Sequence, residues 1–290
     1  MNKNELMKMA ADFVEGSEHN FVSPGVALSE NVAGLRIFQT PVLTCAKADD
    51  EKFYLLKEPS SVGKHFLLPQ EWLPQSKTVI SIFFPFTEEV RASNARDMSR
   101  PSDEWLHGRI EGQALIDKLC LFLKSQLLKA GYRCIIPALD ERFWAKTGLT
   151  HISPYRDNAG EACLSFTSNW SERHVAFVCG QGTFGLSRGL ITRKGMAGRF
   201  GSVITDLPLS PDQRDYDGIY EYCSLCGACA RNCPVDAISV ENGKNHKQCS
   251  EFLDKMAKRF KPRLGCGKCQ IDVPCESGRP DKRGELRNSK

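Results

Sequence analysis

The stretch Cys223-Ser-Leu-Cys-Gly-Ala-Cys-Ala-Arg-Asn-Cys-Pro-Val-Asp-Ala-Ile238 places four cysteines within eleven residues, with a proline directly after the last of them. The spacing C-x2-C-x2-C-x3-C-P is the ligand pattern of the bacterial [4Fe–4S] site. A cubane cluster needs thiolates at four corners, and a tight turn with two-residue gaps delivers three of them. In proteins with this pattern the fourth cysteine, here Cys233, binds a second cluster. The stretch therefore predicts a ferredoxin-like domain with two clusters.

A second group of cysteines follows and completes the ligand sets. Cys249 stands alone, Cys266-Gly-Lys-Cys269 repeats the two-residue gap, and Cys275 lies in Val273-Pro-Cys-Glu276. Eight cysteines fill two cubanes without remainder, and the motif's usual behaviour predicts a crossed pairing. The predicted ligands are Cys223, Cys226, Cys229 and Cys275 for cluster 1, and Cys233, Cys249, Cys266 and Cys269 for cluster 2. Two alternatives stay open: a structural zinc site with four cysteine ligands, and a single cluster with spare cysteines.

The remaining five of the thirteen cysteines are scattered through the first 180 residues and are expected to be buried small hydrophobes. They are Cys45, Cys120, Cys134, Cys163 and Cys179. The odd total and the lack of a recognisable signal peptide argue against a disulfide framework.

Length and composition indicate a globular protein. A chain of 290 residues has room for one large domain and a smaller one. A net charge of +4 permits an anionic substrate or nucleic acid as partner without requiring either. The apolar runs, such as Val79 to Phe86, are too short to span a bilayer as a helix. We expect no membrane association and a cytoplasmic location, in an anaerobic or well-protected cytoplasm.

Upstream of the cysteines, helix and strand patterns alternate. Apolar residues recur at helical spacing over residues 1–16 and 105–130, and Gly131 is placed to end the second helix. Residues 41–44, 78–84, 133–137 and 202–209 are predicted strands, and 78–84 is a buried one. Residues 63–76 carry two prolines and are predicted to be a surface connection, and the polar residues 210–221 a linker. The alternation predicts a layered α/β or α+β domain.

The segment Gly180-Gln-Gly-Thr-Phe-Gly185 matches G-x-G-x-x-G, which alone is a weak signal. Three interpretations are open: a dinucleotide-binding turn, glycines that serve tight turns and a helix cap, and a glycine-rich wall against a flat cofactor. On the last of these, Gly180, Gly182, Gly185 and Arg188 are the predicted cofactor-binding residues. Arg188 belongs to a basic stretch that either contacts phosphates or forms a solvated face.

From residue 160 to residue 275 the sequence resembles the epoxyqueuosine reductases, and most closely a shorter, epoxyqueuosine reductase-like branch. The shared segments, in order, are Glu172-Arg-His-Val-Ala176, Gly180-Gln-Gly-Thr-Phe-Gly-Leu-Ser187, Leu190-Ile-Thr192, Gly201-Ser-Val-Ile-Thr-Asp-Leu-Pro-Leu209, the cysteine motif, and the marks Cys266-Gly-Lys-Cys-Gln270 and Val273-Pro-Cys-Glu276. The resemblance implies a corrinoid in a nitroreductase-like domain beside a two-cluster ferredoxin domain, a plan that reductive dehalogenases share.

On this basis we expect an α/β (α+β) nitroreductase-like domain over 1–210, a two-cluster ferredoxin-like domain over 211–277 and a charged tail over 278–290. The clusters would pass electrons to cobalamin, or alternatively to a flavin, for reduction of a small-molecule or tRNA-borne substrate. A low-potential donor of the ferredoxin or flavodoxin type would supply the electrons. The alternative is an electron-transfer protein that reduces a partner and holds no catalytic cofactor beyond its clusters.

The chain departs from the family pattern at the proton donor. Where the resemblance places a catalytic aspartate, six positions before Glu172, this chain has Phe166. A donor is needed when a reduced oxygen leaves as water. His174 is the one weak candidate, with a plain hydrogen-bonded helix histidine as the alternative. Trp170 and Phe184 either stack on a planar ring or pack in the core.

Overall fold

The computed structural model of the chain describes residues 1–146 and 166–280. Cys163, which was expected to be buried, lies outside the described residues, as do residues 281–290 of the charged tail.

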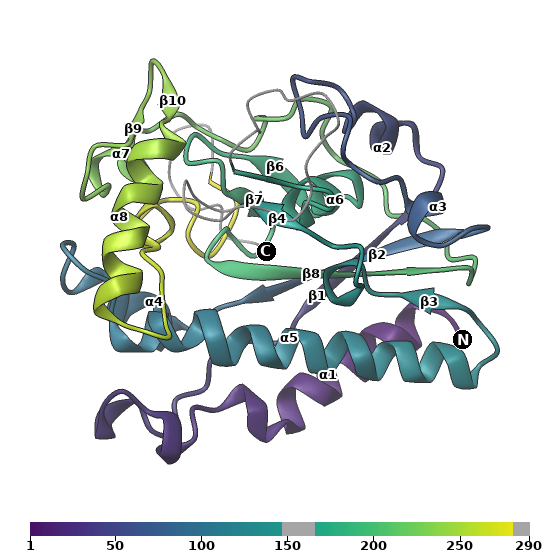
Figure 1. Ribbon diagram of the computed structural model, residues 1–290, viewed down its shortest axis with the longest axis horizontal. Helices are drawn as coiled ribbons and strands as arrows, with labels where there is room; N and C mark the ends of the chain where they lie inside the picture. Colours follow the sequence, from purple (N-terminus) through teal and green to yellow (C-terminus); the bar gives the residue numbers. More distant parts are fainter. Residues whose placement is uncertain (147–165, 281–290) are drawn as a thin grey trace.

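A four-stranded antiparallel sheet forms the centre of the fold (Figure 1). Its strand order is β1-β2-β8-β3, with β1 at Val42–Lys47, β2 at Thr78–Pro85, β8 at Gly198–Thr205 and β3 at Cys134–Ile135. In register, Ile80 of β2 pairs with Cys45 of β1 on one side and Val203 of β8 on the other. Every residue of β2 is buried, as its continuous apolar sequence predicts for a central strand covered on both faces.

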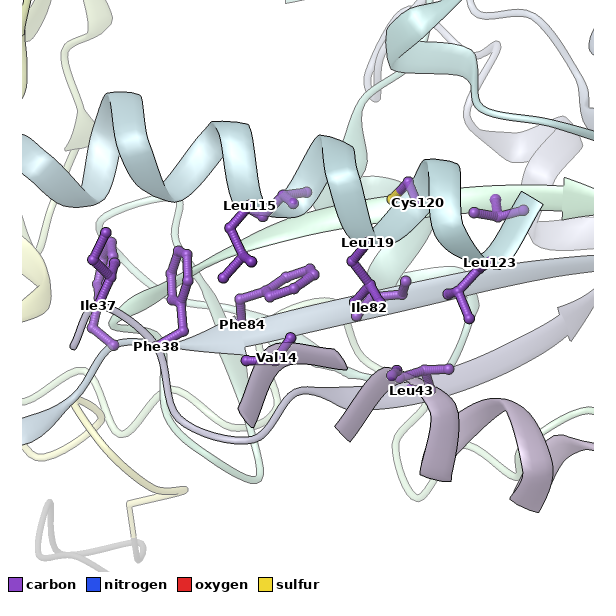
Figure 2. Close-up of a cluster of buried hydrophobic side chains, with 14 of the residues drawn as sticks. Val14, Ile37, Phe38, Leu43, Ile82, Phe84, Leu115, Leu119, Cys120 and Leu123 are labelled. Atoms are coloured by element: carbon purple, nitrogen blue, oxygen red, sulfur yellow. The ribbon is translucent and has the colours of Figure 1, made fainter. Parts of the chain in front are cut away.

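Two long helices cover one face of the sheet. They are α1 (Lys3–Gly16) and α5 (Asp103–Lys129), and both follow their predicted ranges within two residues. Ser102 caps the start of α5 by accepting a hydrogen bond from the backbone of Trp105, and Gly131 follows its end with a left-handed φ of 86°. Figure 2 shows side chains of α5 pointing toward those of β2 and α1 in this core.

The opposite face carries shorter elements and a second core. Here lie α6 (Glu172–Val178) and the hairpin of β6 (Gly182–Phe184) and β7 (Leu190–Thr192), with α2 (Glu51–Leu55) and α3 (Pro69–Trp72) beside them. Trp170 is 1% exposed and stacks on Phe66 at 5.4 Å between ring centroids. Its ring therefore belongs to the core and is not free to stack on a ligand.

Smaller elements complete the large domain. They are α4 (Glu88–Ala95), the strand pair β4 (Ala145–Lys146) and β5 (Thr167–Ser168), and the 3-10 turns η1 (Glu18–Asn20), η2 (Pro24–Val26), η3 (Glu30–Val32) and η4 (Pro137–Leu139). The described residues thus form a mixed α/β structure, as predicted. The nitroreductase-like assignment stays a prediction.

The cysteine-rich region lies at one end of the sheet (Figure 1). It contains α7 (Ala228–Arg231), the hairpin of β9 (Ile238–Ser239) and β10 (Gly243–Lys244), α8 (His246–Arg259) and the turn η5 (Lys268–Gln270). It is tied to the large domain by polar contacts. Arg91 forms an ion pair with Glu276 at 2.6 Å, and the amide of Asn94 donates to the carbonyl of Cys266 at 2.9 Å.

Three predicted segments differ from the structure. The strand predicted at 133–137 is limited to β3, Cys134–Ile135, and Pro137 already begins η4. Residues 63–76 are not only a surface connection, because they contain α3 and place Phe66 and Trp72 in the core. The strand predicted at 202–209 begins earlier, at Gly198, and ends at Thr205. Residues 210–221 contain no helix or strand, as a linker should, but they are anchored: Asp212 accepts a hydrogen bond from the backbone of Cys45 at 2.7 Å.

Candidate functional site

The eight C-terminal cysteines line two cavities, four at each. One cavity is lined by Cys223, Cys226, Cys229 and Cys275. The other is lined by Cys233, Cys249, Cys266 and Cys269. These are the same two sets that the motif's crossed pairing gives, and cluster binding by them stays a prediction. We refer to the two sets as cysteine group 1 and cysteine group 2.

The two groups are built on one repeated backbone turn. Gly227 follows Cys226, and Gly267 follows Cys266, and each glycine has φ 71° and ψ 0°. Such left-handed conformations favour glycine. A side chain at Gly267 would also collide with the Trp105 indole, 2.0 Å from the position of a Cβ atom. The repeat extends to Asp236 and Asp272, each three residues after a cysteine of group 2, with φ of 50° and 51°.

Electrostatic coupling acts both within group 1 and between the two groups. Burial raises the pKa of the Cys275 thiol, and the thiols of Cys229, Cys223 and Cys226 raise it further. Burial also raises the pKa of Cys229, to about 12, and its largest electrostatic contribution comes from Cys269 of the other group. Thiols of the two groups are therefore close enough to affect one another's pKa.

The arrangement fits polynuclear clusters better than zinc. Zinc binds cysteine at about 2.3 Å in a tetrahedron, so its ligands must converge on one point. Among residues 1–146 and 166–280, no three His, Cys, Asp or Glu side chains come close enough to share one ion. The thiols instead surround cavities, as the corners of a larger group would require. The backbone N–H of Ala237 also donates to the sulfur of Cys233 at 3.2 Å, a contact typical of cluster ligands.

Group 1 packs against the glycine-rich segment of the large domain. The backbone of Met196 donates to the carbonyl of Cys275 at 2.9 Å, and Ala197 donates to that of Glu276 at 3.1 Å. Gly195 permits this approach, because a Cβ atom there would lie 2.1 Å from the Glu276 oxygen. Gly182 is explained in the same way, since its Cβ would lie 1.9 Å from the carbonyl of Ile191 on β7.

The structure thus places the four predicted cofactor-binding residues in different surroundings. Gly180 and Gly182 pack against protein, and Gly185 lines the cavity of group 1. Only Arg188 lines the larger cavities that extend into the large domain. Cofactor binding by the three glycines remains a prediction, and turn formation accounts for Gly182 without a ligand.

A large cavity begins at group 2 and continues into the large domain. The part beside the cysteines has a volume of about 460 Å³, and the part beyond it about 1100 Å³. Small-molecule sites usually span about 300–1,000 Å³, so a cofactor and a substrate could share this space. We call the residues that line both parts the junction. Its ionisable members are Arg109, Arg173, His174, Arg188, Arg199 and His246.

Four carboxyl side chains line the inner part of the cavity, those of Glu58, Asp117, Glu172 and Asp217, and burial raises the pKa of two of them. Glu172 accepts a hydrogen bond from Ser202 at 3.1 Å, while its other oxygen is buried without a partner among the described residues. Burial raises its pKa to about 7, with a further contribution from Asp117. Burial also raises the pKa of Asp117, which accepts a hydrogen bond from Gln113 at 2.8 Å. Glu172 is therefore partly protonated at neutral pH.

His174 lines the cavity but is a poor acid. Its Nδ1 is hydrogen-bonded to the hydroxyl of Ser171 at 2.7 Å. Burial lowers its pKa to about 4, and Arg173 and Arg188 lower it further. Phe166, which occupies the position of the expected aspartate, also lines the cavity and stacks on His246 at 5.6 Å between ring centroids.

Sequence reasoning missed most of the polar side chains that line the cavity from the scaffold. Arg109, Gln113 and Asp117 lie four residues apart on α5, so they form one polar stripe along the helix. That stripe was a readable signal. Arg199 on β8 belongs to the same basic stretch as Arg188, for which phosphate contact was one of the two predicted roles. The carboxyl group of Glu172 gave no such signal, because only the tertiary fold brings it to this stripe.

Comparison with known proteins agrees with the cysteine chemistry. The family model described as a 4Fe-4S binding domain matches residues 218–239. Over 68 residues the chain is 44% identical to a tetrachloroethene reductive dehalogenase of Desulfitobacterium hafniense, which is 23% of this chain and 12% of that protein. Over 108 residues it is 34% identical to an epoxyqueuosine reductase of Leadbetterella byssophila, which is 34% of each chain.

A solved structure of epoxyqueuosine reductase from Streptococcus thermophilus superposes with a TM-score of 0.45 and 19% identity, covering 99% of this chain and 68% of that one. The predicted resemblance is confirmed: the chain is similar in sequence to an epoxyqueuosine reductase and to reductive dehalogenases. It matches only 12% to 34% of the length of these curated relatives. Among the described residues, no helix has the length and apolar character needed to cross a membrane.

Proposed function

We propose that this chain is an iron–sulfur reductase in which two [4Fe–4S] clusters deliver electrons to a corrinoid, or alternatively a flavin, held in the cavity of the large domain. One observation carries the proposal. The thiols of cysteine group 2 line the same continuous cavity as His174 and Arg199 of the large domain. A cluster on these thiols would therefore face any molecule bound in the cavity.

The proposed path of the electrons, from group 1 to group 2 and then to the cavity, begins at the protein surface. Cys226 is the exposed cysteine of group 1, and its neighbour Leu225 is 56% exposed. A low-potential donor of the ferredoxin or flavodoxin type would deliver electrons here. Cys229 and Cys269 then connect group 1 to group 2, and group 2 opens onto the cavity.

When bound, the clusters supply single electrons and the corrinoid or flavin supplies the centre at which a substrate is reduced. The chain's own residues bind the clusters, orient the substrate and supply a proton to it. The turns at Gly227 and Gly267 hold the cysteines, and the walls of the cavity bind the substrate. Glu172, whose pKa burial raises to about 7, has one oxygen without a partner among the described residues and lines the same cavity as Phe166, which replaces the acid. We assign the role of proton donor to Glu172 rather than to His174.

Anaerobic purification followed by iron, sulfide and cobalt analysis tests this proposal. We expect close to eight irons per chain, because each of two cubanes holds four. Titration with hydroxocobalamin and with flavin mononucleotide should then give one equivalent of one of them bound, with changes in the visible and EPR spectra. Iron close to eight with neither molecule bound would overturn the proposal and assign the chain to electron transfer with a partner protein.

The substrate remains to be chosen between two classes. The resemblance favours a tRNA-borne base, whereas Phe166 in place of the acid speaks against the epoxyqueuosine reaction itself. Turnover of an epoxyqueuosine-containing tRNA stem loop by the loaded protein would decide for the first class. Lack of turnover, with a small molecule oxidising the reduced protein, would decide for the second.

A further inference from the structure

The junction has an unusual charge distribution. Its ionisable side chains are four arginines and two histidines, and no described carboxylate lines it. Three of the arginines come from three different elements of the scaffold: Arg109 from α5, Arg173 from α6 and Arg199 from β8. Like charges on rigid elements are costly to hold together unless an opposite charge lies between them.

None of the three guanidinium groups forms an ion pair with a carboxylate in the described part of the chain, although Asp117 lies near enough to Arg199 to affect its pKa. Neither Arg109 nor Arg173 forms a hydrogen bond or an ion pair there, and both are accessible from the cavity. Arg199 donates to the side-chain oxygen of Gln113, while its Nε is buried without a partner. Arg188 differs, because it contacts the Tyr220 hydroxyl and ring.

Electrostatics confirm that these groups repel one another. Burial lowers the pKa of Arg109, and Arg173 lowers it further. Burial lowers the pKa of Arg199 to about 9, with contributions from Arg109 and Arg173 and a partial offset by Asp117. Only Arg173 is offset by the thiols of group 2, Cys269 and Cys249. Arg109 and Arg199 thus line one cavity, and Asp117 is the carboxylate that offsets either of them among the described residues.

We propose that the junction binds the phosphate or carboxylate group of a small anionic ligand, held by Arg109 and Arg199 beside cysteine group 2. The planar guanidinium groups suit two-pronged hydrogen bonding to such oxygens. The Arg199–Gln113–Asp117 chain of hydrogen bonds fixes one of the two arginines before any ligand arrives. The proposal deepens the proposed function by giving the chemical class of the molecule that the cavity takes.

Isothermal titration of the cluster-loaded protein with inorganic pyrophosphate, at low salt and without turnover, tests the site. We expect one equivalent bound. Arg109→Gln and Arg199→Gln should each weaken binding roughly 10- to 100-fold, because each removes charge-assisted hydrogen bonds. Arg193→Gln is the matched control, since its side chain is 72% exposed and pairs with Asp215 at 3.3 Å. It should leave the affinity within about twofold, as expected for a surface position.

Three further measurements complete the test. Iron content and the unfolding midpoint of each variant, with Arg199→Lys as a charge-keeping substitution, separate a lost anion site from a lost fold. If flavin mononucleotide binds tenfold more tightly than riboflavin, and this difference is lost in Arg109→Gln, the bound anion is the phosphate of the cofactor. Pyrophosphate that still binds to flavin- or corrinoid-loaded protein would assign it to the substrate.

No binding of pyrophosphate to well-folded, iron-replete protein would overturn the proposal, as would an equal loss of affinity in Arg193→Gln. Because the binding assay does not measure turnover, it tests the anion site separately from electron delivery. Either proposal can therefore be refuted without refuting the other.

Discussion

The crossed ligand sets can be tested by counting iron in paired cysteine variants. Cys223→Ala combined with Cys275→Ala removes two thiols that line the same cavity, so only one cluster should be lost. Iron should fall from about eight to about four per chain, since each cubane holds four. Cys223→Ala combined with Cys269→Ala removes one thiol from each cavity, and iron should fall to about zero.

A sequential arrangement gives the opposite result. If Cys233 shared a cluster with Cys223, the pair Cys223→Ala and Cys275→Ala would disable both clusters, and Cys223→Ala with Cys233→Ala would spare one. The assay is anaerobic reconstitution followed by iron and sulfide analysis, with EPR of the reduced protein to count the remaining clusters. Retention of about four irons in the Cys223/Cys233 pair, with loss of all iron in the Cys223/Cys275 pair, would refute the crossed grouping.

Three further predictions concern acid–base chemistry, packing and ligand identity. Because the folded-state pKa of Glu172, about 7, lies above its ordinary 4.5, the stability it contributes is present at low pH and lost as pH rises toward 7. Urea unfolding at pH 5 and pH 8 should show this decline in the wild type, with Glu172→Gln much flatter. Gly182→Ala should lower the free energy of unfolding by about 1–3 kcal/mol or more, because the new Cβ would lie 1.9 Å from the Ile191 carbonyl at a φ of 157°. Cys226→Ala should lose iron and visible absorption, whereas Cys120→Ala, buried in the core of the large domain, should keep both.

Each of these has a control and a contrary result. A pH profile of Glu172→Gln that matches the wild type would exclude Glu172 as the titrating group. Gly16→Ala, where a Cβ would meet nothing within 4 Å, is the control for Gly182→Ala, and equal effects would mean that the close contact is unimportant. Equal loss of iron from Cys226→Ala and Cys120→Ala would remove the basis of the ligand assignment.

The cysteine groups were predictable because their geometry is local. The two-residue gaps between cysteines can be read directly from the sequence. The structure adds that Gly227 and Gly267, which lie in these gaps, have the same left-handed conformation. The buried strand β2 and the helix α5 were equally readable, because a continuous apolar run and a three- to four-residue period have few other solutions.

The rest depends on contacts between distant residues. Arg109 and Arg199 are separated by much of the large domain in sequence, and only the packing of α5 against β8 makes them neighbours. The sequence left open whether the glycines make tight turns or a cofactor wall. In the structure Gly182 and Gly195 serve close approaches of protein backbone, which no local pattern distinguishes. Trp72 was assigned to a surface connection, because its core partner Trp170 lies on a remote segment.

The measurement that tests the central claim most directly is stopped-flow mixing of the dithionite-reduced, cluster-loaded protein with bound hydroxocobalamin or flavin mononucleotide. The account predicts that the clusters are reoxidised as the cofactor is reduced, and that Cys269→Ala, which removes a thiol facing the cavity, abolishes this coupling. Clusters that stay reduced beside a bound, oxidised cofactor, or coupling that survives in Cys269→Ala, would contradict it.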